Sequence, residues 1–129
     1  MTLSEYQKQA MQTCMPSCDN FSYMFLNLVG EVGELASKVA KAIRREEMAI
    51  GEGMHPNHTN QLEHTGNLPF DEANKFDEDL MLEAGDILWQ LNGLATVMGW
   101  SMEDVAQSNL DKLASRQKRG VIAGSGDHR

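Results

Sequence analysis

The sequence predicts an all-α protein, and three observations support that fold class. Apolar residues recur at helical spacing over stretches near 22–47, 71–98 and 102–119. The chain has nine methionines but only three prolines, and aromatic residues make up 6% of it, which favours helices over a β-sandwich. At 129 residues it has the length of one domain with a single core. We therefore expect one domain, residues 1–129, built as a four-helix bundle that assembles into oligomers.

The first two predicted helices occupy the N-terminal third of the chain. The first covers about residues 4–14, and Pro16 ends it. The second covers about residues 22–47 and has the clearest helical periodicity of the sequence. Ser22 is its expected N-cap, because a serine hydroxyl accepts a hydrogen bond from the first turn.

The third and fourth predicted helices occupy the C-terminal half. The third begins near Asp71, a residue suited to an N-cap, and Gly99 stops it. Ser101 and Asp104 then form an N-cap of the capping-box type. The fourth helix continues to about Arg119.

Two segments are expected to lie outside the helices. Residues 51–70 are rich in Gly, Asn and His and lack periodicity, which predicts a long loop. Its histidines, His55, His58 and His64, fit no structural zinc spacing and have no cysteine beside them, so a polar loop is favoured over a zinc site. Residues 120–129 contain too much glycine for a helix and are predicted to be a flexible tail.

The charge of the chain restricts its partners. The formal net charge is −8 and the pI is near 4.8, which argues against a nucleic-acid polymer as partner, because such proteins display a basic face. An acidic protein can still bind phosphates when a metal ion reverses the local field. No apolar stretch is long enough to span a membrane, and the N-terminus lacks a signal-peptide layout. We expect a cytoplasmic protein, in the host cytoplasm if it is viral.

Two pairs of carboxylates stand at helical spacing within apolar stretches. Glu31 and Glu34 are three residues apart in the second helix, and Glu83 and Asp86 are three apart in the third. Each pair therefore lies on one helix face. An ordinary solvated acidic surface would give the same spacing. Buried carboxylates without partners are costly, however, and hard oxygen ligands of this kind suit Mg²⁺ or Mn²⁺.

Glycines flank these carboxylates. Gly30 and Gly33 interrupt the second helix, and Gly85 lies between Glu83 and Asp86 in the third. Each costs about 1 kcal/mol relative to alanine in a helix interior. We expect them to let the two helices approach closely enough for the carboxylates to share metal ions.

The fourth helix carries a polar stripe. An amide and three cations recur every three or four residues, at Asn109, Lys112, Arg116 and Arg119. Such a stripe is either an exposed amphipathic face or a site for the phosphates of a polyphosphate. Lys38 could join the same phosphates or neutralise Glu34 as an i,i+4 pair.

Three segments resemble a known family in their order along the chain: LVGEVGELA, LEAGDILWQLNGLA and SMEDVAQSNLDKLASRQKRG. They are similar to the motifs of the MazG-like all-α nucleoside triphosphate pyrophosphohydrolases. The resemblance implies cleavage between the α and β phosphates, which yields the monophosphate and pyrophosphate and requires Mg²⁺ or Mn²⁺. It places the metal ligands and catalytic residues at Glu31, Glu34, Glu83 and Asp86, and phosphate-binding residues at Asn109, Lys112 and Arg116.

The resemblance also suggests finer assignments. Glu34 is our choice of general base. The tail is similar to that of short phage-type members, which implies a lean toward a purine such as dGTP and makes Lys118, Arg119 and Arg129 candidates for phosphate contacts. Residues 51–70 match no motif of the family. The base pocket is expected beside the first carboxylate motif and one turn beyond Asp86, at Asn20, Phe21, Tyr23, Asn27 and Gln90.

Other hypotheses remain open at this point. The same carboxylates could serve a non-catalytic nucleotide or metal sensor. A di-iron or di-manganese bundle is disfavoured, because no histidine lies three residues after any of these acids. Apolar faces on more than one side of the second and third helices predict a homodimer or homotetramer.

Overall fold

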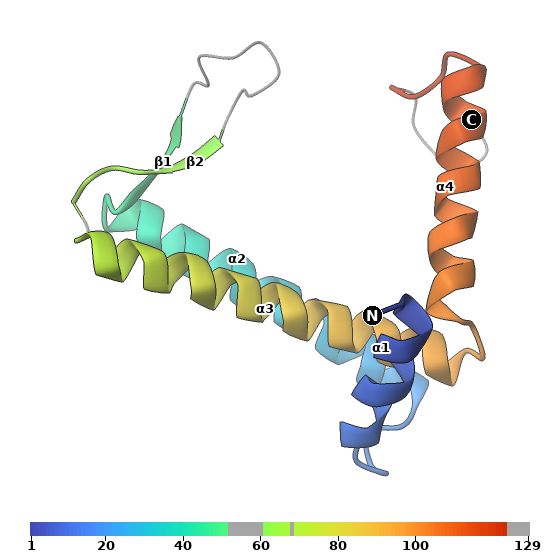
Figure 1. The fold of residues 1–129 in the computed structure, drawn as a ribbon. Helices are drawn as coiled ribbons and strands as arrows, with labels where there is room; N and C mark the ends of the chain where they lie inside the picture. Colours follow the sequence, from blue (N-terminus) through green and yellow to red (C-terminus); the bar gives the residue numbers. More distant parts are fainter. Residues whose placement is uncertain (52–60, 68, 124–129) are drawn as a thin grey trace. The chain divides into compact units, whose positions relative to one another are not determined.

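The computed structural model describes residues 1–51, 61–67 and 69–123, and Figure 1 shows the order of its elements. Helix α1 (Leu3–Ala10) is followed by a 3-10 turn, η1 (Met11–Thr13), and by helix α2 (Phe21–Arg44). Strands β1 (Met48–Gly51) and β2 (Gln61–His64) precede helices α3 (Phe70–Val97) and α4 (Met102–Lys118). The all-α prediction is confirmed.

The chain divides into two compact units. The first, here called the terminal unit, combines Met1–Met24 with Leu91–Arg129, and the second, the central unit, is Phe25–Gln90. In the part of the chain that the structure describes, no helix is both long and apolar enough to cross a membrane.

In the central unit, α2 and α3 lie side by side, and the hairpin of β1 and β2 lies between them in chain order (Figure 1). Strands β1 and β2 pair antiparallel, with Met48 opposite His64. The prediction of a loop over 51–70 is therefore wrong at Gly51 and at Gln61–His64. Backbone hydrogen bonds hold this short ribbon, and its sequence lacks the apolar alternation by which strands are recognised. The His64 Nε2 lies 3.0 Å from Asp77 Oδ1, which ties β2 to α3. His55 and His58 lie outside the described residues.

The starts of the helices agree with the sequence only in part. Asn20, not Ser22, caps α2, because its Oδ1 accepts from the Tyr23 N–H at 2.9 Å. Asp71 lies inside the first turn of α3 rather than at its cap. The Ser101 cap of α4 is confirmed, since its hydroxyl accepts from the Asp104 N–H at 3.0 Å. Side-chain caps satisfy amide groups that the helix itself leaves without partners.

Helices α3 and α4 end in the same hydrogen-bonding motif. Gly99 follows α3 with φ 73°, and the next N–H, of Trp100, donates to the carbonyl of Ala95. Gly120 follows α4 with φ 68°, and the Val121 N–H donates to the carbonyl of Arg116. Glycine adopts positive φ without steric cost, so it is the usual residue at this position. The predicted stop at Gly99 is confirmed.

Helix α2 ends in the same motif without a glycine. Glu46 has φ 58°, and the Glu47 N–H donates to the carbonyl of Ala42 at 3.0 Å. Positive φ costs an ordinary L-residue about 1–2 kcal/mol. The hairpin holds Glu46 in place, because the Thr65 hydroxyl and the Asn67 amide both donate to its carbonyl.

The terminal unit joins the N-terminal residues to the turn between α3 and α4. The backbone N–H of Ser4 donates to Glu103 Oε1 at 2.7 Å, and its hydroxyl donates to the other oxygen. These donors lower the pKa of Glu103. The Gln7 side chain donates to the Trp100 carbonyl at 3.0 Å and accepts from the Met102 N–H at 2.9 Å. One glutamine therefore bridges the end of α3 and the start of α4.

Candidate metal centre

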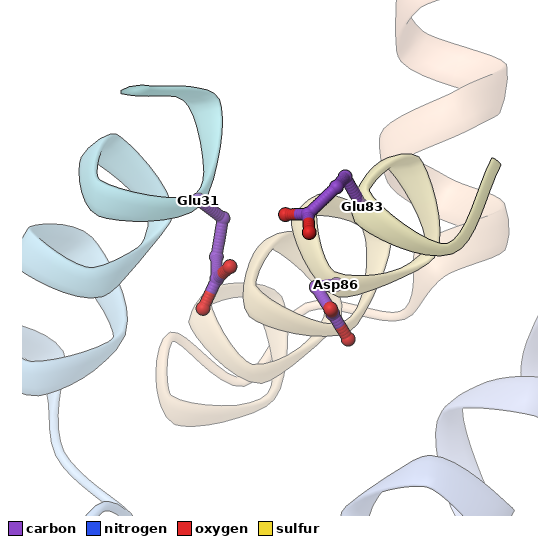
Figure 2. A group of neighbouring side chains, drawn as sticks. All are labelled: Glu31, Glu83 and Asp86. Carbon is purple, nitrogen blue, oxygen red and sulfur yellow. The ribbon is translucent and has the colours of Figure 1, made fainter. Parts of the chain in front are cut away.

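Three carboxylates converge in the central unit. Glu31 projects from α2, Glu83 projects toward it from α3, and Asp86 lies beside Glu83 on α3 (Figure 2). One oxygen of each lies within 4.8 Å of the others. Glu31 and Glu83 are half-buried and Asp86 is exposed. The i,i+3 spacing of Glu83 and Asp86 places both on one face of α3, and α2 brings Glu31 to that face.

Glu31 lies partly buried and close to three other carboxylates, and both features affect its pKa. Partial burial, followed by the charges of Glu34, Asp86 and Glu83, raises the pKa of Glu31 above its ordinary value. The Asn27 amide donates to Glu31 Oε1 at 3.0 Å and opposes this rise. Glu34 is exposed and is not one of the three converging residues. Its predicted roles as metal ligand and general base stay predictions.

Lys38 pairs with a carboxylate of the neighbouring helix. Its Nζ lies 2.6 Å from Glu83 Oε1, rather than on Glu34 as the i,i+4 spacing allowed. The other oxygen of Glu83 is buried and accepts no hydrogen bond from the described residues. The lysine thus satisfies only one of the two oxygens of Glu83.

These residues fit a divalent cation. Carboxylate oxygens are the donors that Mg²⁺ and Mn²⁺ prefer. The buried, unpaired Oε2 of Glu83 needs a partner, since a buried charged oxygen without one is costly. A bound cation would also remove the repulsion that raises the pKa of Glu31. Glu31, Glu83 and Asp86 are the residues that would hold it.

The glycines beside these carboxylates do not have the role expected of them. A Cβ added at Gly33 or Gly85 would meet no atom within 4 Å among the described residues, and one at Gly30 would meet only Asn27 Oδ1 at 3.8 Å. The prediction that they permit close helix approach is wrong within this chain. Close approach occurs instead at Gly93 of the terminal unit, where a Cβ would lie 2.7 Å from the Cε of Met24. Gly93 has no carboxylate beside it in the sequence, so the acidic motifs did not indicate a role for this glycine.

The polar stripe of α4 is not a single exposed face. Arg116 is buried in the terminal unit, whereas Asn109 is exposed. Arg119 is exposed and its Nε donates to Ser115 Oγ at 3.3 Å. Lys118 is also exposed, and Arg129 lies outside the described residues.

Asn109 and Lys112 line a cavity of about 530 Å³ in the terminal unit, together with Trp100 and Asp104. Trp100 and Asp104 were not predicted from the sequence as neighbours of these phosphate-binding candidates. The spacing indicates this position for Asp104 alone, because Asp104 and Lys112 are eight residues apart on α4 and lie within one helix face, whereas Trp100 precedes the helix.

The predicted base-binding residues are distributed over both units. In the terminal unit, both amide atoms of Asn20 serve the start of α2, since Nδ2 donates to the Ser17 carbonyl and Oδ1 accepts from Tyr23. Phe21 and Tyr23 are exposed. In the central unit, Asn27 contacts Glu31, and Gln90 is buried with its Oε1 lacking a hydrogen-bond partner among the described residues.

The chain is similar to a known protein family and to a phage protein. The model of the MazG nucleotide pyrophosphohydrolase domain matches residues 20–121. The chain is also 36% identical over 113 residues to the Gene 37 protein of Mycobacterium phage L5, an alignment that covers 88% of this chain and 80% of that protein. No solved structure matches significantly.

Proposed function

Because the chain belongs to the MazG nucleotide pyrophosphohydrolase family, we propose that it hydrolyses nucleoside or deoxynucleoside triphosphates to the monophosphate and pyrophosphate. The observation that carries the proposal is the convergence of Glu31, Glu83 and Asp86 within 4.8 Å of one another. Bound Mg²⁺ or Mn²⁺ supplies an activated water and neutralises charge on the phosphates. No nucleophilic side chain is needed for this chemistry.

The protein's own residues then have three tasks. Glu31, Glu83 and Asp86 hold the metal, and we propose Glu34 as a further ligand or as the base that accepts the proton of the attacking water. Asn109, Lys112, Arg116 and Arg119, with Lys38, are the proposed phosphate-binding residues. The cavity lined by Asn109 and Lys112 supports the first two of these assignments. We keep a purine such as dGTP as the favoured substrate.

We also propose that the chain works as a homodimer or homotetramer. Phe25, Leu26, Val29 and Val32 form an apolar stripe on α2, and each is between 47% and 68% exposed in the single chain. Exposed apolar stripes of this kind are typical of interaction surfaces. A second copy of the chain is the simplest partner, because homo-oligomers dominate among soluble assemblies.

The test is a product analysis of the purified protein with each common NTP and dNTP, in Mg²⁺ or Mn²⁺. We expect equal amounts of monophosphate and pyrophosphate, with the highest rate on a purine triphosphate. The Asp86→Asn variant should lose at least about 100-fold in rate, because it weakens the metal centre. Glu78→Gln, which changes an exposed acid on the same helix, should keep the activity.

Other products would contradict the proposal. Diphosphate with orthophosphate would show cleavage at the wrong bond. Tight nucleotide binding with no product over hours would favour the sensor that uses the same carboxylates. Size-exclusion chromatography with light scattering measures the oligomeric state in the same preparation, and a monomer at micromolar concentration would contradict the proposed assembly.

A further inference from the structure

The ion pair between Lys38 and Glu83 lies within the candidate metal centre. Lys38 Nζ lies 2.6 Å from Glu83 Oε1, while one oxygen of Glu83 lies within 4.8 Å of oxygens of Glu31 and Asp86. The pair joins α2 to α3, because each residue comes from a different helix. One monovalent cation thus already occupies part of the space that a divalent cation would use.

The two partners differ in their freedom to move. The Glu83 side chain is 12% exposed and the Lys38 side chain is 38% exposed. Glu83 is therefore held in the centre, whereas Lys38 can swing its ammonium group into water on a flexible four-carbon stem. A metal ion on the free Oε2 of Glu83 would lie close to the ammonium group on Oε1 of the same carboxylate, and the two cations repel each other.

We propose that Lys38 is a displaceable counter-ion for the metal centre: it occupies Glu83 when no divalent cation is bound and leaves Glu83 when one binds. The inference concerns regulation of the centre described under the proposed function and rests on that centre's metal binding, not on its turnover. Lys38 then has two opposite effects. It stabilises the metal-free protein and weakens the apparent affinity for the metal.

The first test is calorimetric titration of the full chain with MnCl₂ alone. Lys38→Met removes the charge and keeps most of the stem length, and we expect it to lower the Kd for Mn²⁺ about three- to tenfold. Lys41→Met is the matched control. Lys41 is an exposed lysine on the same helix and forms no ion pair among the described residues, so its removal should leave the Kd within about twofold.

The second test measures thermal unfolding in EDTA, where no metal contributes. Lys38→Met should lower the Tm, and the rise in Tm on adding Mn²⁺ should be larger than in the wild type. In a Glu83→Gln background, Lys38→Met should no longer lower the metal-free Tm, because its partner is gone. This double-mutant cycle isolates the pair from other effects of the substitution, and circular dichroism confirms that each variant is folded.

Three results would overturn the inference. An unchanged Kd in Lys38→Met would show that the ammonium does not compete with the metal, and a higher Kd would show that it positions Glu83 for binding. An equal fall of the Kd in Lys41→Met would show that the effect comes from the change in net charge alone. Normal Mn²⁺ binding without pyrophosphate release would contradict the proposed function and leave the role of Lys38 intact.

Discussion

Helices α3 and α4 end in the terminal unit with glycine at the positive-φ position, whereas α2 ends in the central unit with Glu46 there. The same contrast recurs inside the helices. Gly93 of the terminal unit gives room to the fully buried Met24, but a Cβ added at Gly33 of the central unit would meet no atom within 4 Å among the described residues. The central unit also crowds Glu31 among like charges. Two of these features, Gly33 and the crowding of Glu31, belong to the candidate metal centre, as expected where function opposes stability, whereas Glu46 lies beyond the end of α2 at the hairpin.

One residue of the terminal unit departs from this contrast. Asn92 is fully buried, and neither side-chain amide atom has a hydrogen-bond partner among the described residues. A buried amide group without a partner costs about 1–3 kcal/mol. The terminal unit therefore has glycine where its helix ends need positive φ, but it leaves a buried polar side chain without a hydrogen-bond partner among the described residues.

The largest expected effect on stability concerns two cationic residues of α4 that differ in burial, Arg116 and Lys112. Arg116→Ala should destabilise the protein by about 2 kcal/mol, because a large buried side chain is removed. Lys112→Ala should change stability by less than about 0.5 kcal/mol and raise KM about tenfold if Lys112 binds phosphate. Denaturant unfolding and steady-state kinetics measure the two effects. Equal losses of stability would show that burial does not distinguish these residues.

Alanine at two glycines should have opposite effects in the two units. Gly93→Ala should destabilise by about 1–3 kcal/mol, since its Cβ would overlap Met24, which cannot move into solvent. Gly33→Ala should stabilise by up to about 1 kcal/mol, because alanine favours the helix and the new Cβ meets no atom within 4 Å among the described residues. Chemical denaturation measures both. A destabilised Gly33→Ala would indicate that another copy of the chain packs there.

Glycine at position 46 should remove the free-energy cost of positive φ at this position of the central unit. Glu46→Gly should stabilise the chain by about 1 kcal/mol, because glycine adopts φ 58° without the clash of a Cβ. Gly120→Ala is the mirror experiment in the terminal unit and should destabilise by a similar amount. A loss of stability in Glu46→Gly would show that the glutamate side chain contributes more than its backbone costs.

The smallest expected effect is the pH dependence of stability that comes from Glu31. Its pKa is raised in the folded protein above the ordinary value of 4.5, so the folded state retains this proton to a higher pH than the unfolded state. Stability from this group therefore falls as pH rises from that value through the raised pKa. Glu31→Gln should raise the Tm of the metal-free protein at about pH 7 and leave it nearly unchanged at about pH 4. The same gain at both pH values would exclude ionisation as the cause.

Much of the candidate metal centre follows from the sequence, because short helical spacing determines which residues share a face. Glu83 and Asp86 lie on one side of α3, and an oxygen of each lies within 4.8 Å of an oxygen of Glu31. The roles of these residues and of Glu34 as metal ligands stay predictions. The partner of Lys38 could not be predicted in this way. Spacing along one helix suggested Glu34, but the lysine pairs with Glu83 on the neighbouring helix, and only the packing of α2 against α3 decides that choice.

The wrong predictions about the fold have a common cause. The pattern of side chains along the sequence says little about which backbone groups form hydrogen bonds. The pairing of β1 with β2 depends on the backbone ladder and on the turn after α2. Asn20 and Ser22 are both good caps, and the choice between them depends on which N–H is left free. Gly99 and Ser101 were predictable because their special roles require particular residue types.

The hydrogen bonds of Ser4 and Gln7 also affect the order in which the protein can fold during synthesis. Ser4 contacts Glu103, a residue 99 positions later in the chain, so Ser4 leaves the ribosome long before its partner exists. The central unit is one continuous segment, Phe25–Gln90, and can form while translation continues. Until α4 has been made, α1 lacks these partners, and chaperones and proteases can reach it on the nascent chain.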